Sequence, residues 1–230
     1  MQRLGWANPK VNGETIWIHA SSIGETKIAL TLYSKLSLLY PETLFFITTT
    51  TSTSKSLITE SKKLKHYYLP LDWLLTIKRF ITLIKPKICI VIETEIWPNL
   101  INICNKNKIP IMIVNGRISS KTSSANNLIK SIYKTALQKI DLIMCKSELE
   151  EENFKSLGGP KLKTEVIGNI KFSQYNTIAN QDNIINKKYV LALSTHPDEE
   201  RQIITEWLKT YGKKVLLVIA PRHPERLGDI

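Results

Sequence analysis

The sequence lacks several features that would place it in a specialised class of protein. Its three cysteines, Cys89, Cys104 and Cys145, are odd in number and far apart, and none forms a CxxC pair. A disulfide framework and a zinc ribbon are therefore unsupported, and a reducing compartment fits best. No apolar run approaches the roughly 18 residues of a membrane span, and the start, MQRLGWANPK, lacks the apolar centre of a signal peptide. We expect a soluble or peripheral protein.

Motifs that bind common cofactors are missing as well. The sequence contains no GxGxxG, GxxxxGK[ST], HExxH or EF-hand loop. Neither a dinucleotide fingerprint, a Walker loop nor a metal site is predicted, and we expect no cofactor. A nucleophilic Ser22 beside His19 is unsupported, because no GxSxG motif surrounds a serine.

Acidic residues are too few to balance the basic ones. The sequence has 32 Lys+Arg and 20 Asp+Glu, a formal net charge of +12, and residues 1–172 hold 24 of the basic and 13 of the acidic residues. Such an excess fits nucleic acid, an anionic membrane surface or a phosphorylated substrate. The joint abundance of Lys, Ile and Asn also fits an AT-biased genome, which explains the excess equally well.

Short apolar runs rich in Ile and Val alternate with helical patterns. Hydrophobic residues make up 43% of the 230 residues, enough for a sizeable core. Because the runs lack polar alternation, we expect strands buried on both faces of a parallel sheet in an open α/β fold. Helical spacing of apolar residues predicts helices in 28–39 and 74–84. Ser147 and the acidic residues after it are typical of a capped helix start, which predicts a helix in 147–156. The strands predicted in the first part are Thr15–His19, Leu44–Thr48, Ile88–Glu93, Ile109–Asn115, Leu142–Lys146 and Glu165–Gly168.

A polar, Asn/Gln-rich stretch divides the chain. We interpret residues 173–188 as a linker between a domain over 1–172 and a second unit over 189–230. Strands Tyr189–Leu193 and Val215–Ala220 and helix Glu199–Tyr211 are predicted in that unit. Since two strands and one helix cannot bury a parallel sheet on both faces, we interpret the unit as the incomplete start of a domain.

The first strand leads into the segment HASSIGE, residues 19–25. In open α/β sheets ligands bind at the carboxyl ends of strands, so this segment is a candidate site. Gly24 permits a tight turn whose N–H groups can meet an anion. Glu25 falls in the first helical turn, where a carboxylate either stabilises the helix dipole or serves as a general base at a cleft.

The next three strands also end in polar residues. The second strand leads into seven consecutive hydroxyl residues, 48–54. This run fits either a polar turn into the next helix or a site that binds a phosphate or sugar. Glu93 and Glu95 follow the third. Desolvating both is costly, so one should face a cleft or a cation, although a solvated loop fits the spacing equally well. After the fourth strand, a glycine turn presents Arg117, which could grip a phosphate.

Two His-Pro segments follow the strands of the second unit. His196 precedes Pro197 and an acidic helix start, and Arg222 and His223 lie between two prolines that favour an extended backbone. Both segments suit an anionic ligand.

Taken in order, these segments resemble the Kdo (3-deoxy-D-manno-octulosonic acid) transferase family. The resemblance runs from about residue 14 to residue 226. It implies the GT-B fold, two Rossmann-like domains facing across a cleft, and an inverting transfer of Kdo from CMP-Kdo to a lipid A precursor without a bound metal. The matching stretches are IWIHASSIGE, TTTTSTS, YYLPLD, IETEIWPN, VNGRIS, GNIKF, LSTHPDEE and IAPRHPER.

The resemblance also implies roles for individual residues. Glu25 takes the place of the general base that deprotonates the acceptor hydroxyl, and one of Glu93 and Glu95 matches a further functional carboxylate. The N-terminal domain is expected to bind the acceptor, and the second unit to begin the sugar-nucleotide domain. The residues expected to bind substrate are Ser22, Gly24, Thr49, Arg117, His196, Pro221 and Arg222.

The sequence departs from the family at both ends. Family members usually carry an N-terminal membrane anchor and continue well beyond IAPRHPER, so we expect a whole acceptor domain and only the edge of a donor domain. An inactive or split-gene fragment of the enzyme, or another GT-B glycosyltransferase, stays open as an alternative. A nucleic-acid binder is disfavoured, because no aromatic stacking platform or helix-turn-helix signature is present.

The resemblance places the protein at the cytoplasmic face of the inner membrane of a Gram-negative bacterium. The expected partners are CMP-Kdo, a lipid A precursor and an anionic membrane surface, with no nucleic acid. Lys78, Arg79 and Lys85 interleave with the apolar face of the stretch 74–84, which resembles a membrane-leaning helix. An ordinary core-packed helix fits this pattern equally well.

Overall fold

A computed structural model describes residues 2–5, 11, 13–118, 122, 125–172, 185, 187–212 and 214–229. The chain divides into two compact units, residues 1–177 and 178–230. The predicted linker, residues 173–188, lies for the most part outside the described residues.

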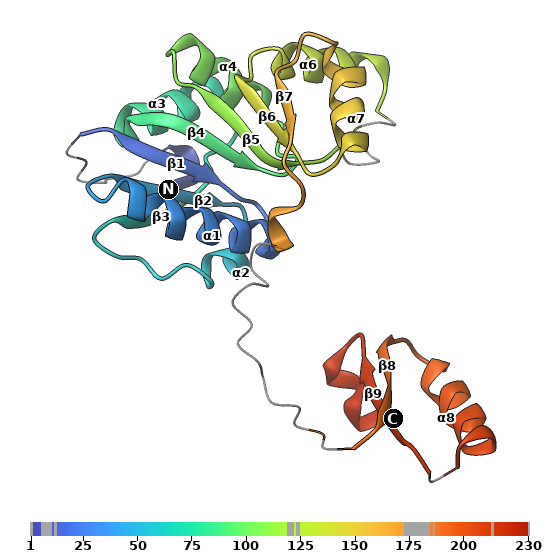
Figure 1. Cartoon of the computed structure of the whole chain (residues 1–230). Coiled ribbons are helices and arrows are strands. Elements are labelled where there is room, and N and C mark those ends of the chain that lie inside the picture. The colour runs from blue at the N-terminus through green and yellow to red at the C-terminus, as the bar shows by residue number, and fades with distance from the viewer. Residues whose placement is uncertain are drawn as a thin grey trace. The chain divides into compact units, whose positions relative to one another are not determined.

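The first unit is built on a seven-stranded sheet in the order β3-β2-β1-β4-β5-β6-β7 (Figure 1), and all its strand pairs are parallel. The chain moves outward from β1 to β3 and then returns to place β4 beside β1, so the order reverses between these two strands. Ligands of open α/β sheets bind at such a switch point. The strands are β1 Thr15–His19, β2 Leu44–Thr49, β3 Leu64–Tyr68, β4 Pro86–Ile92, β5 Ile111–Gly116, β6 Leu142–Cys145 and β7 Thr164–Val166.

Helices cover the two faces of this sheet unequally (Figure 1). Side chains alternate between faces along a strand, so Trp17 packs on one face and its neighbour Ile18 on the other. Residues of α3, α4, α6 and α7 join the core around Trp17, and residues of α1 join the core around Ile18. The helices are α1 Ile23–Leu39, α2 Ser52–Lys55, α3 Leu74–Ile84, α4 Pro98–Lys106, α6 Asn127–Leu137 and α7 Glu148–Gly158.

The α/β class and the parallel sheet predicted from the sequence are confirmed, with differences at particular elements. The six strands predicted in this unit are present, β1 with the predicted bounds and the others with ends that differ by at most two residues. β3, α4 and α6 were not predicted. β3 reads Leu-Lys-His-Tyr-Tyr and lies at the sheet edge, where partial exposure tolerates polar residues. Helix α1 begins at Ile23, before its apolar pattern, because Ser22 caps it.

The second unit is small. β8 Tyr189–Thr195 pairs in parallel with β9 Leu216–Pro221, and α8 Glu199–Thr210 connects them, followed by a 3-10 turn over Pro224–Asp229. Among the described residues of this unit no apolar side chain is fully buried, and Leu193 is 69% exposed. Its strands therefore leave apolar side chains in contact with solvent.

Over the described part of both units, no helix combines the length and the apolar character that crossing a bilayer requires.

Candidate active site

The carboxyl ends of β1 and β4 bring together the segments that follow them. His19, the last residue of β1, pairs with Val91, close to the end of β4. The chain then continues into Ser21–Glu25 on one side and into Glu93–Trp97 on the other. Three carboxyl groups, those of Glu25, Glu93 and Glu95, consequently gather at the switch point of the sheet.

Glu25 is held by the turn that starts α1. Its backbone N–H donates to the Oγ of the N-cap residue Ser22 at 3.2 Å, and Ser22 Oγ donates to Glu25 Oε1 at 2.8 Å. The N–H of Ser21 donates to Glu25 Oε2 at 2.7 Å. This arrangement is a variant of the capping box, in which cap and glutamate satisfy each other. These hydrogen bonds fix the position of the Glu25 carboxyl group, whereas the side chain of an unbonded surface glutamate is mobile.

Two effects oppose each other in setting the charge of Glu25. Burial raises its pKa, since only 7% of the residue is exposed, and the hydrogen bonds from Ser22 and Ser21 lower it. Repulsion from Glu95 and Glu93 raises it again, so that the pKa lies above the ordinary value. A carboxylate with a raised pKa is the stronger base, which suits proton abstraction.

Glu95 lies in the opposite environment, beside a buried histidine. His19 Nε2 is 3.7 Å from Glu95 Oε2 and 3.2 Å from Ser21 Oγ, and Trp97 Nε1 donates to Glu95 at 2.9 Å. Burial by itself raises the pKa of Glu95, but the hydrogen bond and charge of His19, with the bonds from Ser21 and Trp97, outweigh it and lower the pKa. Two neighbouring carboxyl groups thus differ in basicity, as in sites that separate acid and base roles.

The orientation of His19 follows from its second ring nitrogen. Nδ1 lies 3.1 Å from the carbonyl oxygen of Thr48 and 3.0 Å from Thr48 Oγ1. Because a carbonyl oxygen only accepts hydrogen bonds, Nδ1 carries the hydrogen. Nε2 is then available to accept from Ser21, or, when protonated, to donate toward Glu95.

Glu93 is almost completely buried and is surrounded by cations. Arg117 Nε lies 2.8 Å from its Oε2 and Lys171 Nζ lies 3.0 Å from its Oε1, while the Glu93 side chain is only 4% exposed. Asn115 Nδ2 adds a weaker bond to Oε1 at 3.4 Å. Such pairing is what a buried carboxylate requires to stay ionised.

Two left-handed residues turn these side chains toward each other. Glu93 has φ 61° and Asn115 has φ 59°, conformations that cost non-glycine residues about 1 kcal/mol or more. Asn115 also accepts the N–H of Ile170 at 3.1 Å, which fixes the turn that carries Lys171. Backbone strain of this kind clusters at functional sites.

The other predicted substrate-binding residues of the first unit are distributed as follows. A Cβ at Gly24 would lie 3.8 Å from Lys171 Nζ, so this glycine borders the carboxylate cluster directly.

Thr49 is fully buried and its Oγ1 lies 2.9 Å from His66 Nε2, below the surface of the hydroxyl run. Thr50 and Ser54 each donate to the Ser21 carbonyl, at 3.1 and 3.0 Å. The hydroxyl run therefore supports the turn that holds Glu25.

His196, Pro221 and Arg222 belong to the second unit. The N–H of His196 donates to Glu199 Oε2 at 2.7 Å, and the N–H of Arg222 donates to the Thr195 carbonyl at 2.9 Å. The first bond ties the end of β8 to the start of α8, and the second links the ends of β8 and β9 within that unit.

Sequence reasoning missed two contributors. Lys171 lies within the stretch GNIKF, but its sequence neighbours do not reveal its role, because that role depends on Glu93, which is remote in the sequence. Asp72, within YYLPLD, accepts the N–H groups of Asn99 and Leu100 at 3.1 and 2.8 Å. It caps α4, whose own N-cap residue, Trp97, makes no such bond. Asp72 thereby fixes the helix that follows Glu95.

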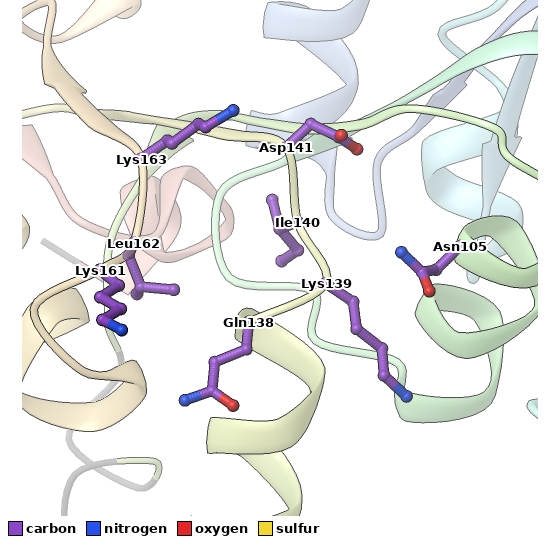
Figure 2. Close-up of a pocket in the computed structure, with 8 residues that line it drawn as sticks. All are labelled: Asn105, Gln138, Lys139, Ile140, Asp141, Lys161, Leu162 and Lys163. Carbon is purple, nitrogen blue, oxygen red and sulfur yellow. The ribbon is translucent and has the colours of Figure 1, made fainter.

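A pocket of about 520 Å³ lies away from this cluster, at the amino ends of β6 and β7 (Figure 2). Helices α4 and α6 end beside it, and lysines there complement the negative ends of helices. Lys139 donates to Asn102 at 2.9 Å, and Asp141 accepts the N–H of Ile111 at 2.8 Å. These contacts indicate that Lys139 and Asp141 stabilise the local structure beside the pocket. The residues that line the pocket are Asn105, Gln138, Lys139, Ile140, Asp141, Lys161, Leu162 and Lys163.

Within the described ranges, no group of three or more His, Cys, Asp or Glu side chains is arranged to hold a metal ion.

Fold and site together define an α/β protein with a carboxylate cluster at the switch point of a parallel sheet. The fold is shared with UDP-GlcNAc 2-epimerase from Neisseria meningitidis bound to UDP-GlcNAc, with a TM-score of 0.60, 13% identity, and coverage of 92% of this chain and 66% of that chain. At this identity the likeness concerns the fold alone.

The family follows from the sequence comparisons. The family model described as 3-Deoxy-D-manno-octulosonic-acid transferase (kdotransferase) matches residues 1–174, and the chain belongs to this family. It is 36% identical over 231 residues to the 3-deoxy-D-manno-octulosonic acid transferase of Haemophilus influenzae and 35% identical over 227 residues to that of Rickettsia bellii. Both alignments cover 94% of this chain and 53% of the relative, so the chain spans about half the length of these relatives.

Proposed function

We propose that the protein takes part in the transfer of Kdo from CMP-Kdo to a lipid A precursor, with inversion at the anomeric carbon and Glu25 as the general base. The observation that supports this most directly is the buried, hydrogen-bonded carboxyl group of Glu25, with a raised pKa, at the switch point of the sheet. It occurs in a member of the Kdo transferase family, at the position that the family resemblance assigns to the base.

The surroundings of Glu25 favour uptake of a proton during the reaction. The acceptor oxygen forms its bond to the anomeric carbon while the bond from that carbon to the CMP phosphate breaks, and Glu25 takes the hydroxyl proton. Once neutral, Glu25 no longer repels Glu93 and Glu95, which favours the transfer. Ser21 and Ser22 hold the carboxyl group in place throughout, so little reorganisation is needed.

The reaction is proposed to need no metal. The carboxylates next to Glu25 have protein partners: Glu93 pairs with Arg117 and Lys171, and Glu95 contacts His19. On the donor side, we propose that Arg222 and Pro221 contact the nucleotide, with His196 nearby on the neighbouring strand end.

An anionic membrane surface is the proposed location, at the cytoplasmic face of the inner membrane and in peripheral contact. The start of α3 carries three exposed apolar side chains, Trp73, Leu74 and Leu75, with exposed fractions of 60, 53 and 70%. Lys78 follows on the exposed surface of the same helix. Further along α3, the side chains of Ile77, Phe80 and Ile81 are buried in the core. The membrane-leaning interpretation therefore suits the first turn of this helix, and the core-packed interpretation suits the later turns. Asp72 ties the start of α3 to α4, near Glu95.

The experiment that tests the base is the substitution Glu25→Gln in the complete enzyme. Glutamine is accepted in capping boxes, so the turn should persist, but it cannot take a proton. We expect transfer from CMP-Kdo to a lipid A precursor to fall by roughly two orders of magnitude or more. Glu14→Gln is the matched control, because Glu14 is 68% exposed and pairs with Lys87 at the surface. Unchanged transfer by the Glu25→Gln enzyme, with a folded protein, would contradict the assignment.

A further inference from the structure

Lys171 reaches the carboxylate cluster from a short 3-10 turn over residues 170–172. Its ammonium lies 3.0 Å from Glu93 Oε1, and its side chain is 46% exposed while that of Glu93 is 4% exposed. The turn is secured by the bond from Ile170 N–H to Asn115 and by a bond from Lys171 N–H to Asn169 Oδ1 at 3.1 Å. Lys171 is thus held in place by its backbone as well as by its charge.

The same ammonium faces the start of α1. A Cβ at Gly24, the residue before Glu25, would lie 3.8 Å from Lys171 Nζ. A cation at a helix N-terminus is electrostatically unfavourable, because the helix dipole is positive there. The position of Lys171 therefore depends on the nearby carboxylates, Glu93 in direct contact and Glu25 one residue further along the helix.

The charged groups of the cluster around Glu25, Glu93 and Glu95 come from several elements. β1 contributes His19; the segment after β4 contributes Glu93 and Glu95; β5 is followed by Arg117; and the 3-10 turn contributes Lys171. Glu95 has His19 as a partner, and Glu93 has two cations. The contacts that hold Glu25 are dipoles, those of Ser21 and Ser22. If a cation beside Glu93 is removed, the negative charge of Glu93 is compensated less, and its repulsion of ionised Glu25 increases.

We propose that Lys171 is a positioning residue that compensates the charge of Glu93 and thereby keeps Glu25 ionised and ready to accept a proton. Arg117 shares this task from the other carboxylate oxygen of Glu93. The catalytic meaning of the coupling rests on the function proposed for Glu25, whereas the coupling itself is a property of the charges and can be measured without turnover.

The test is an NMR titration of the glutamate side-chain carboxyl carbons in the full chain. In Lys171→Met we expect the titration midpoint of the Glu25 carboxyl group to rise by about one pH unit. In Lys171→Arg, which keeps the positive charge, we expect the wild-type midpoint. Lys161→Met is the matched control. Lys161 is an exposed lysine beside the pocket at the amino ends of β6 and β7 (Figure 2), so its substitution should leave the titration midpoint of Glu25 unchanged. Backbone amide spectra check that each variant is folded.

A Glu25 midpoint that does not move in Lys171→Met overturns the proposal, whether or not the midpoint of Glu93 moves. A second measurement, the acidic limb of the pH profile of kcat/KM in the complete enzyme, separates the coupling from the function. If the Glu25 midpoint rises but the limb stays in place, the coupling stands and the assignment of Glu25 as the base is wrong. A limb that rises with the midpoint supports both.

Discussion

At the residue scale, Glu25 is both the glutamate of a capping box, with Ser22 as the N-cap, and a carboxyl group with a raised pKa. The two interpretations of its sequence position, a first-turn carboxylate that stabilises the helix dipole and a general base, apply to the same side chain. Its capping bonds favour the ionised form, while burial and the repulsion from Glu95 and Glu93 disfavour it. Ionised Glu25 therefore reduces the stability of the fold.

This opposition predicts an unusual pH dependence of stability. Because the pKa of Glu25 is higher in the folded than in the unfolded chain, the folded state binds more protons, and stability is lost as pH rises from the ordinary glutamate value through the folded pKa. We expect Glu25→Gln to be at least as stable as wild type at pH 7, with the difference shrinking toward pH 4. Urea unfolding of the chain at several pH values measures this.

The control is Glu25→Ala, which removes the charge and the side-chain bonds of the capping box together. It should be less stable than Glu25→Gln by about 1 kcal/mol, the size of a typical capping interaction. A Glu25→Gln variant that is clearly less stable than wild type at pH 7 would show that the capping bonds outweigh the cost of burial and repulsion.

At the scale of elements, α3 exposes apolar side chains at its start and buries apolar side chains further along. Trp73 and Leu75 are exposed, whereas Ile77, Phe80 and Ile81 are buried. An apolar turn followed by a lysine suits insertion into the headgroup region of an anionic bilayer.

We predict that the double substitution Trp73→Ser, Leu75→Ser weakens binding of the chain to vesicles containing anionic lipid by about tenfold or more, because two exposed apolar side chains are lost. Co-sedimentation measures the binding. The matched control is Leu38→Ser, Leu39→Ser, since these residues are 81 and 71% exposed at the far end of α1. Equal losses in both variants would mean that apolar exposure alone, and not this turn, governs binding.

Sequence patterns predicted elements well where local chemistry decides them. Ser147 and the acidic turn after it predicted the start of α7, and apolar spacing predicted α3 in full. The start of α4 could not be predicted in this way, because its cap, Asp72, is supplied by the segment before α3. β3 was missed because its sequence, with Lys65 and His66, is polar, and its place in the sheet is set by its pairing with β2.

At the scale of the whole molecule, the two units differ in how much apolar surface they bury. The first has two apolar cores, one on each face of the sheet, whereas the described residues of the second include no fully buried apolar side chain. Opening of β8 and β9 therefore exposes little additional apolar surface, and the energetic cost of opening is low.

We predict that backbone amides of β8 and β9 in this chain exchange with solvent at least about a hundredfold faster than those of β1 and β4. Hydrogen–deuterium exchange followed by mass spectrometry measures the difference, with β3 as an internal control for an edge strand in a unit that has a core. Comparable protection of β8 and β1 would contradict the prediction.

The sequence by itself determined the alternation of strands and helices and the place of Glu25 in the first helical turn, because each depends on residues that are neighbours in the chain. Tertiary structure alone decided which carboxylate meets which cation. Glu93 pairs with Arg117 and Lys171 because parallel strands bring their carboxyl ends to one edge and because left-handed residues turn the side chains inward. The charge state of Glu25 follows from that assembly, since repulsion acts through space and not along the chain.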